Sequence, residues 1–189
     1  IKLNEITGNK ARTTSFELSG GKIELTKAQV MSLYLLNKQP DAQEHIYTGG
    51  IKAAPVVARG EKGRRARIQK SFEVIKVTPE DVDEIIGSMS KEEKALADGI
   101  GKFFTDYTAE WGNEVSEKLY GYRKFTVENY FPIVSDKNYI NQVFGETTDM
   151  TLKNMGSTKS RIKGANNPII IEDVIDVFTR QVDSMASYN

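Results

Sequence analysis

The amino-acid sequence predicts an α+β fold in which helices predominate, with a small β-hairpin near the N-terminus. Two short alternating runs around Gly20-Gly21 predict the hairpin. Apolar residues at spacings of three and four predict a long amphipathic central helix and a C-terminal helix. With 189 residues, the chain is long enough for one medium domain or two small ones.

The N-terminal region predicts a hairpin followed by two helices. Phe16–Leu18 and Ile23–Leu25 alternate apolar and polar residues on either side of the Gly-Gly turn. Thr26 is a typical N-cap for the helix that should follow. Pro40 should interrupt this helix, and Gly49-Gly50 should end the shorter helical segment after it.

Residues 51–71 have a different composition, and we expect an irregular loop or an extended ribbon there. This region is the boundary that we predict between an N-terminal hairpin-helix lobe, residues 1–50, and a mainly helical lobe, residues 72–189. One continuous domain is the alternative. Residues 72–77 have strand character because aromatic and β-branched side chains are frequent there.

Two helix starts follow in close succession. Thr78-Pro79 combines a cap with a proline at the first helical position, and Ser90 with Glu93 forms a capping-box pattern. The second start predicts a long helix. Its expected apolar stripe consists of Leu96, Ile100, Phe103, Tyr107, Trp111, Val115 and Leu119.

The C-terminal third predicts an extended segment at residues 129–134, since Pro132 disfavours helix at the preceding residue. A final helix should begin near Glu172-Asp173, and its apolar pattern continues to Tyr188. The sequence starts at Ile1 without an initiator Met or a signal peptide. We therefore expect this chain to be a segment of a longer polypeptide.

The amino-acid composition excludes several classes of function for this chain. There are no cysteines and only one histidine, His45, which excludes thiolate chemistry and multi-histidine metal centres. Equal numbers of basic and acidic residues, 26 each, remove the global electrostatic argument for nucleic-acid or membrane-surface binding. No apolar run is long enough for a transmembrane helix. Gly20-Gly21 and Gly49-Gly50 are turns and not a phosphate loop, because neither is followed by Gly-Lys-Ser/Thr. Since the sequence contains no assembled catalytic set, we predict no catalytic residue and no cofactor.

Three stretches of the sequence are distinctive. They are residues 25–38, residues 109–133 with their Ala-Glu-Trp-Gly-Asn-Glu-Val-Ser and Asn-Tyr-Phe-Pro-Ile strings, and residues 164–173 with Gly-Ala-Asn-Asn-Pro-Ile-Ile-Ile-Glu-Asp. Together they resemble segments of the large polyvalent proteins of phages and mobile elements in gut bacteria. The resemblance implies a connector joined to neighbouring domains of a larger polypeptide, with no assigned catalytic residues. It also implies a location in the bacterial cytoplasm or in the phage particle.

The best electrostatic feature is a basic segment in which only Glu61 is acidic. Several phosphates of DNA or RNA could be contacted by its cations, which predicts a salt-dependent nucleic-acid site. A solvated surface loop, or docking on an acidic partner, is the alternative. The candidate residues are Arg59, Lys62, Arg64, Arg65, Arg67 and Lys70. Lys159, Arg161 and Lys163 would extend this patch if the fold brought them close.

Acidic residues recur along one face of the expected central helix. Asp106, Glu110 and Glu117 fall opposite Trp111 in the expected helix, and carboxylates at such spacing could hold Mg²⁺ or Mn²⁺. A metal-dependent nuclease would need this geometry in a cleft. The alternative, which the amphipathic pattern favours, is a solvated helix face.

An aromatic cluster has two interpretations, namely core packing, which is the simpler one, and a binding groove. Its members are Trp111, Tyr120, Tyr122, Phe125, Tyr130 and Phe131. The leading functional hypothesis is a non-catalytic structural or interaction module of a phage or mobile-element polyprotein. Nucleic-acid binding through the basic segment and metal-dependent nuclease activity are the alternatives.

Overall fold

The computed structural model describes residues 3–8, 12–55, 57–59, 65–67, 73–126, 128–135 and 167–187. It confirms the predicted α+β, mainly helical class. After a short helix α1 (Leu3–Thr7), strands β1 (Thr13–Leu18) and β2 (Gly21–Thr26) form the predicted antiparallel hairpin. Alternate residues of both strands are buried, so one face of the hairpin packs on the core.

Helices α2 (Lys27–Asn37) and α3 (Pro40–Gly49) follow, with the predicted proline at the start of the second. Thr26 and Gln29 form a capping box at the start of α2. Gly50 closes α3 with a φ of 84°, which a side chain would strain. A Cβ at Gly49 would lie 2.3 Å from the backbone oxygen of Asn167. These two glycines allow α3 to end against a distant part of the chain.

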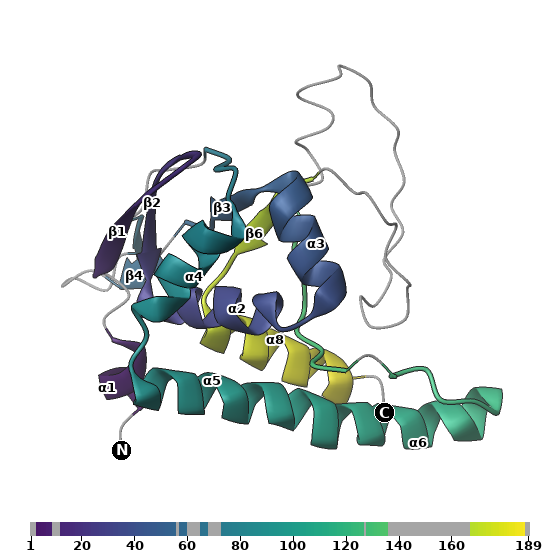
Figure 1. The fold of residues 1–189 in the computed structure, drawn as a ribbon. Coiled ribbons are helices and arrows are strands. Elements are labelled where there is room, and N and C mark those ends of the chain that lie inside the picture. Colours follow the sequence, from purple (N-terminus) through teal and green to yellow (C-terminus); the bar gives the residue numbers. More distant parts are fainter. Residues whose placement is uncertain are drawn as a thin grey trace.

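A small mixed sheet lies in the middle of the fold (Figure 1). Strand β3 (Ile51–Ala53) pairs in parallel with β6 (Ile169–Ile171), and Ile51 lies opposite Ile169. Antiparallel bridges add Ile75 beside β3 and Ser135 beside β6. The order of the extended segments is therefore Ile75, β3, β6, Ser135. Of the predicted strand at residues 72–77, the structure shows the bridge at Ile75, and Phe72 lies outside the described residues.

The buried amide of Gln29 connects α2 to this sheet. Its Nε2 donates to the carbonyl oxygens of Ala54 and Ile171, at 2.9 Å and 3.1 Å. Its Oε1 accepts from the backbone N–H of Thr26 at 2.9 Å. One side chain thus satisfies backbone groups at the N-terminus of α2 and at the ends of β3 and β6.

The carboxylate of Asp81 fixes the hairpin turn to the next helix, α4 (Pro79–Gly87). It accepts hydrogen bonds from the backbone N–H of Ser19 at 3.0 Å, from that of Thr78 at 2.9 Å, and from the Ser19 hydroxyl. Asp81 is buried. These hydrogen bonds, with that of the Ser19 hydroxyl largest, lower the pKa of Asp81 from 3.8 to about 2.

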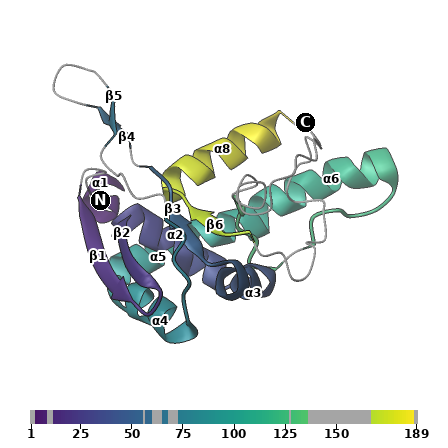
Figure 2. The ribbon, with the colours of Figure 1, turned by 90° about the horizontal axis from the view of Figure 1, so that it is seen from above.

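A long helical rod runs along one side of the molecule, through α5 (Lys91–Lys102), a π-helix η1 (Phe103–Thr108) and α6 (Ala109–Tyr120). Figure 1 shows that α6 projects beyond the rest of the fold, and Figure 2 shows the same projection from above. The last helix, α8 (Val174–Ala186), begins next to Glu172-Asp173 as predicted, and Asp173 is its N-cap. Among the described helices, none combines the length and the apolar character that crossing a membrane requires.

The basic region contains a second antiparallel pair, β4 (Val57–Arg59) and β5 (Arg65–Arg67). An extended ribbon was one of the two predictions for residues 51–71. The hydrophobic core contains residues from Phe16 to Val177, so both predicted lobes supply core residues. The boundary between these lobes stays a prediction.

We expect Asp81→Asn to lower the free energy of unfolding by about 2 kcal/mol at pH 7, because an amide cannot accept all the hydrogen bonds of the carboxylate. The pKa of Asp81 is lower in the folded state, so its contribution is complete above pH 3.8 and is lost as the pH falls toward 2. Urea unfolding of both proteins at pH 7 and at pH 2.5 measures this difference. Asp83→Asn, at an exposed position of the same helix, is the control and should change stability by less than about 0.5 kcal/mol. A difference between the wild type and Asp81→Asn that stays constant with pH would contradict this role.

Candidate interaction groove

The π-helix η1 determines which side of the rod faces the core. The backbone N–H of Ala109 donates to the carbonyl of Phe104, five residues earlier, and the Thr108 hydroxyl donates to the same carbonyl at 2.8 Å. A π turn contains more residues than an α turn, so the side chains that follow are rotated about the helix axis. The buried positions from here onward are Phe104, Thr108, Gly112, Asn113 and Ser116.

The predicted apolar stripe is therefore wrong in its second half. Ile100 is buried and Phe103 is half-buried, as expected. Beyond Phe103, however, Tyr107 is 67% exposed, Trp111 44% and Leu119 64%. The prediction assumed an uninterrupted α-helical period, and the π turn displaces the buried register by about one residue.

An apolar groove lies where the rod meets α8. It has a volume of about 260 Å³ and is lined by Phe103, Tyr107, Thr108, Trp111, Val182 and Met185. The ring of Tyr107 stacks on Phe103 with centroids 5.5 Å apart, and Phe103 meets Phe178 of α8 edge-on at 5.2 Å. These ring contacts fix the positions of the aromatic side chains along one wall of the groove.

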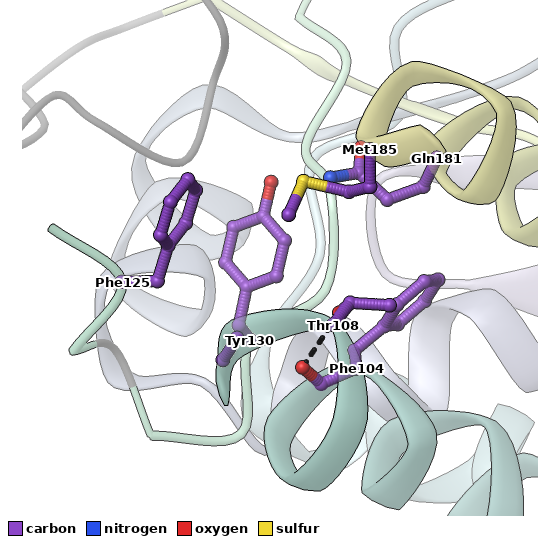
Figure 3. Close-up of a pocket in the computed structure, with 7 residues that line it drawn as sticks. Phe104, Thr108, Phe125, Tyr130, Gln181 and Met185 are labelled. Atoms are coloured by element: carbon purple, nitrogen blue, oxygen red, sulfur yellow. Dashed lines mark hydrogen bonds between the residues drawn. The ribbon is translucent and has the colours of Figure 1, made fainter. Parts of the chain in front are cut away.

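A smaller pocket lies beside the groove (Figure 3). It has a volume of about 20 Å³, roughly that of one water molecule, and Met185 and Thr108 line both spaces. In Figure 3, Phe125, Tyr130 and Met185 surround the pocket, while Thr108 bonds to the carbonyl of Phe104.

Two buried polar side chains of α6 hold the following loop, residues 121–126, against the helix. Asn113 donates to the carbonyl of Phe125 at 2.9 Å and accepts from its N–H at 2.8 Å. The hydroxyl of Ser116 donates to the carbonyl of Tyr122 at 2.8 Å and accepts from the N–H of Lys124 at 3.3 Å. The chain therefore folds back along α6 with its backbone groups satisfied, and this positions Phe125 beside the small pocket.

Gly112 makes the close packing of this region possible. A Cβ at this position would lie 2.7 Å from Cε2 of Phe125 and 2.8 Å from Cε of Met185. Both contacts are closer than packed carbon atoms approach. Gly112 therefore weakens the helix intrinsically but lets the loop and α8 close over it.

The residues of the predicted aromatic cluster differ in burial. Phe125 and Phe131 are buried and Tyr130 is half-buried, as the core interpretation requires. Trp111, Tyr120 and Tyr122 are exposed, and Trp111 lines the groove. The ammonium of Lys124 lies 3.2 Å from the centroid of the Tyr120 ring. The groove interpretation therefore fits Trp111 better than the core interpretation.

The recurring acidic residues of the central helix face solvent. Asp106, Glu110 and Glu117 are exposed, and Glu110 forms an ion pair with Arg123. In the described part of the chain, no group of three or more histidine or acidic side chains could hold a metal ion. The structure thus does not bring these three carboxylates together into a metal site, and the solvated-face interpretation agrees with their exposure.

The basic segment is described in part. Arg59 is the last residue of β4 and lies opposite Arg65 of β5, and Arg67 lies opposite Val57. Residues two apart on a strand share a face, so Arg59, Arg65 and Arg67 occupy positions on one face of the ribbon. Lys62, Arg64 and Lys70 lie outside the described residues, as do Lys159, Arg161 and Lys163.

The sequence analysis did not predict that α8 lines the groove or that the amide of Asn113 holds the loop after α6. Val182 and Met185 belong to the recognised apolar pattern of the last helix, but their position opposite η1 follows from tertiary packing. Asn113 carries a detectable signal, since an amide on the inner side of a helix requires a partner. Comparison of the chain with protein-family models, curated proteins and solved structures finds no match.

We expect opposite effects from two glycine-to-alanine changes in the rod. Gly99→Ala should raise the free energy of unfolding by about 1 kcal/mol, because nothing lies within 4 Å of the added Cβ and alanine favours helix. Gly112→Ala should lower it by about 1 kcal/mol, because overpacking against Phe125 costs about 2 kcal/mol and exceeds the gain in helix propensity. Thermal and urea unfolding would measure both values. An equal gain for the two variants would contradict the packing described for Gly112.

Proposed function

We propose that this chain is a non-catalytic interaction module whose aromatic groove binds a segment of another protein or of a neighbouring domain. The observation that supports it best is the groove between η1, α6 and α8, whose lining includes exposed Tyr107 and Trp111. Exposed apolar patches on folded proteins mark interaction sites, and tryptophan and tyrosine contribute most to binding energy there. The resemblance to large polyvalent proteins of phages and mobile elements supplies the context of this proposal, a connector between domains.

A random peptide library selected against the chain tests this function. We expect independent binders to compete for one site and to lose about thirty-fold in affinity when Trp111 is replaced by Ala, since a central aromatic anchor contributes about 2 kcal/mol. Tyr122→Ala is the matched control, because Tyr122 is exposed but does not line the groove. Circular dichroism establishes that both variants fold. Binders that are insensitive to Trp111→Ala would reject the groove as the interaction site.

A second candidate function is nucleic-acid binding through the β4–β5 ribbon. The specific observation in its favour is the register, which gives one ribbon face three arginine positions. Like charges directly opposite each other destabilise a two-stranded pair, so a polyanion would relieve this repulsion. The major groove of B-DNA is also wide enough for a two-stranded ribbon.

Fluorescence anisotropy with labelled duplex and single-stranded DNA tests this second candidate. We expect the affinity to fall steeply as salt rises, and Arg59→Ala, Arg65→Ala and Arg67→Ala together should abolish binding at low salt. Replacing Lys22, Lys52 and Lys91 with Ala removes the same number of charges elsewhere and should leave binding unchanged. Absence of binding at low salt, or binding that is insensitive to salt, would remove this candidate.

A further inference from the structure

The two helical walls of the groove carry a strong excess of negative charge, although the whole chain is neutral. Helices η1, α6 and α8, residues 103–120 and 174–186, contain six acidic and two basic side chains. The acidic residues are Asp106, Glu110, Glu114, Glu117, Asp176 and Asp183. A ligand that occupied this groove would meet a negative field along both walls.

Some of these acids lie next to the groove itself. Glu114 follows Trp111 by three residues in α6, so the two side chains share a helix face. Asp183 is adjacent to Val182 on the opposite wall. Glu114 and Asp183 are exposed and form no ion pair with any described residue. They are therefore available to a cationic partner.

Three cations near the groove, Arg180, Arg123 and Lys124, are already engaged. Arg180 of α8 pairs with Glu172, and this hydrogen bond raises the pKa of Arg180. Arg123 pairs with Glu110. Lys124 lies over the ring of Tyr120. A lysine or arginine of a partner could bind an exposed aromatic ring of this surface in the same way.

The shape of the groove favours a helix as its occupant. Its walls are helical segments, and α6 with 12 residues is about 18 Å long. An amphipathic helix inserts apolar side chains at positions i, i+4 and i+7 into such a groove, and its flanks then face the rims. Because the rims here are acidic, those flanks should carry lysine or arginine.

We infer that the groove takes a basic amphipathic helix of a partner protein, with apolar anchors between Trp111 and Val182 and cations against Glu114 and Asp183. This inference rests on the proposed interaction function and specifies its partner. Charge complementarity favours a positively charged partner, and the apolar lining supplies the contact area.

Two synthetic 14-residue peptides test the inference. Both carry leucine at the same helical positions and lack tryptophan, and their polar positions are lysine in one and glutamate in the other. Trp111 is the only tryptophan of the chain, so its emission reports occupancy of the groove directly. The leucine-lysine peptide should shift this emission to shorter wavelength and saturate, with a Kd that rises at least ten-fold from 50 to about 500 mM NaCl. The leucine-glutamate peptide should produce no shift at the same concentrations.

Variants locate the contact. Anisotropy of a labelled leucine-lysine peptide should show at least a five-fold loss of affinity for Glu114→Gln combined with Asp183→Asn, and a larger loss for Trp111→Ala. Glu84→Gln, at an exposed position of α4, is the matched control and should bind like the wild type. Equal losses for the control and the groove variants would overturn the inference, because they would show a general charge effect.

Further results of these experiments would overturn the inference. Equal binding of both peptides, or binding of neither, would overturn the basic helix as partner. Sedimentation could show that the chain self-associates and that Trp111→Ala abolishes this association. That result would assign the groove to a second copy of the chain and would also overturn the inference. These failures are distinguishable from failure of the proposed function, which depends on whether library peptides of any charge require Trp111.

Discussion

The structure depends on the parallel pairing of β3 with β6, which joins Ile51 to Ile169 across more than half of the chain. Two such short strands bury backbone groups at their ends, and an unsatisfied buried group costs about 1–3 kcal/mol. The amide of Gln29 removes this cost at the carbonyl of Ala54 and bonds at the same time to the start of α2. It also gives the carbonyl of Ile171 a second hydrogen bond, beside the one from the backbone N–H of Ala54. Helix α8 begins three residues after β6, so the pairing also decides where α8 lies. The groove therefore depends on a sheet in which none of its residues takes part.

The second constraint is the π turn, which converts an amphipathic helix into a helix with two different surfaces. In α5 the apolar side faces the core, through Ile100 and Ala97. From the end of η1 onward, the inner side is formed by Thr108, Gly112 and Asn113, which are small or polar, while aromatic residues face outward. Exposing aromatic side chains gives up about 1.5–3 kcal/mol of burial for each. Glycine, asparagine and serine on the inner side are used instead to close the loop and α8 tightly over α6.

The features that the sequence predicts well are local. The caps Thr26, Thr78 and Ser90 and the hairpin turn follow from hydrogen bonds between residues a few positions apart, and the structure confirms them. The β3–β6 pairing was not predictable in this way, because residues 51–53 and 169–171 carry no signal that they pair with each other. The exposure of Trp111 was missed for another reason. Its spacing matches an ideal α-helix, and only the observed hydrogen bond from Ala109 to Phe104 reveals the π turn.

The neutral composition is a weak guide to partners for a physical reason. Salt screens exposed charges beyond about 10 Å at 0.1 M ionic strength, and α6 alone is about 18 Å long. Figures 1 and 2 place the β4–β5 ribbon and α6 at opposite ends of the molecule. A ligand at one end therefore does not experience the charges at the other. The total charge of the chain averages over many such regions, among them a ribbon with three arginine positions and a groove between mainly acidic helices. A ligand at the groove would meet the local charge, and that charge is negative.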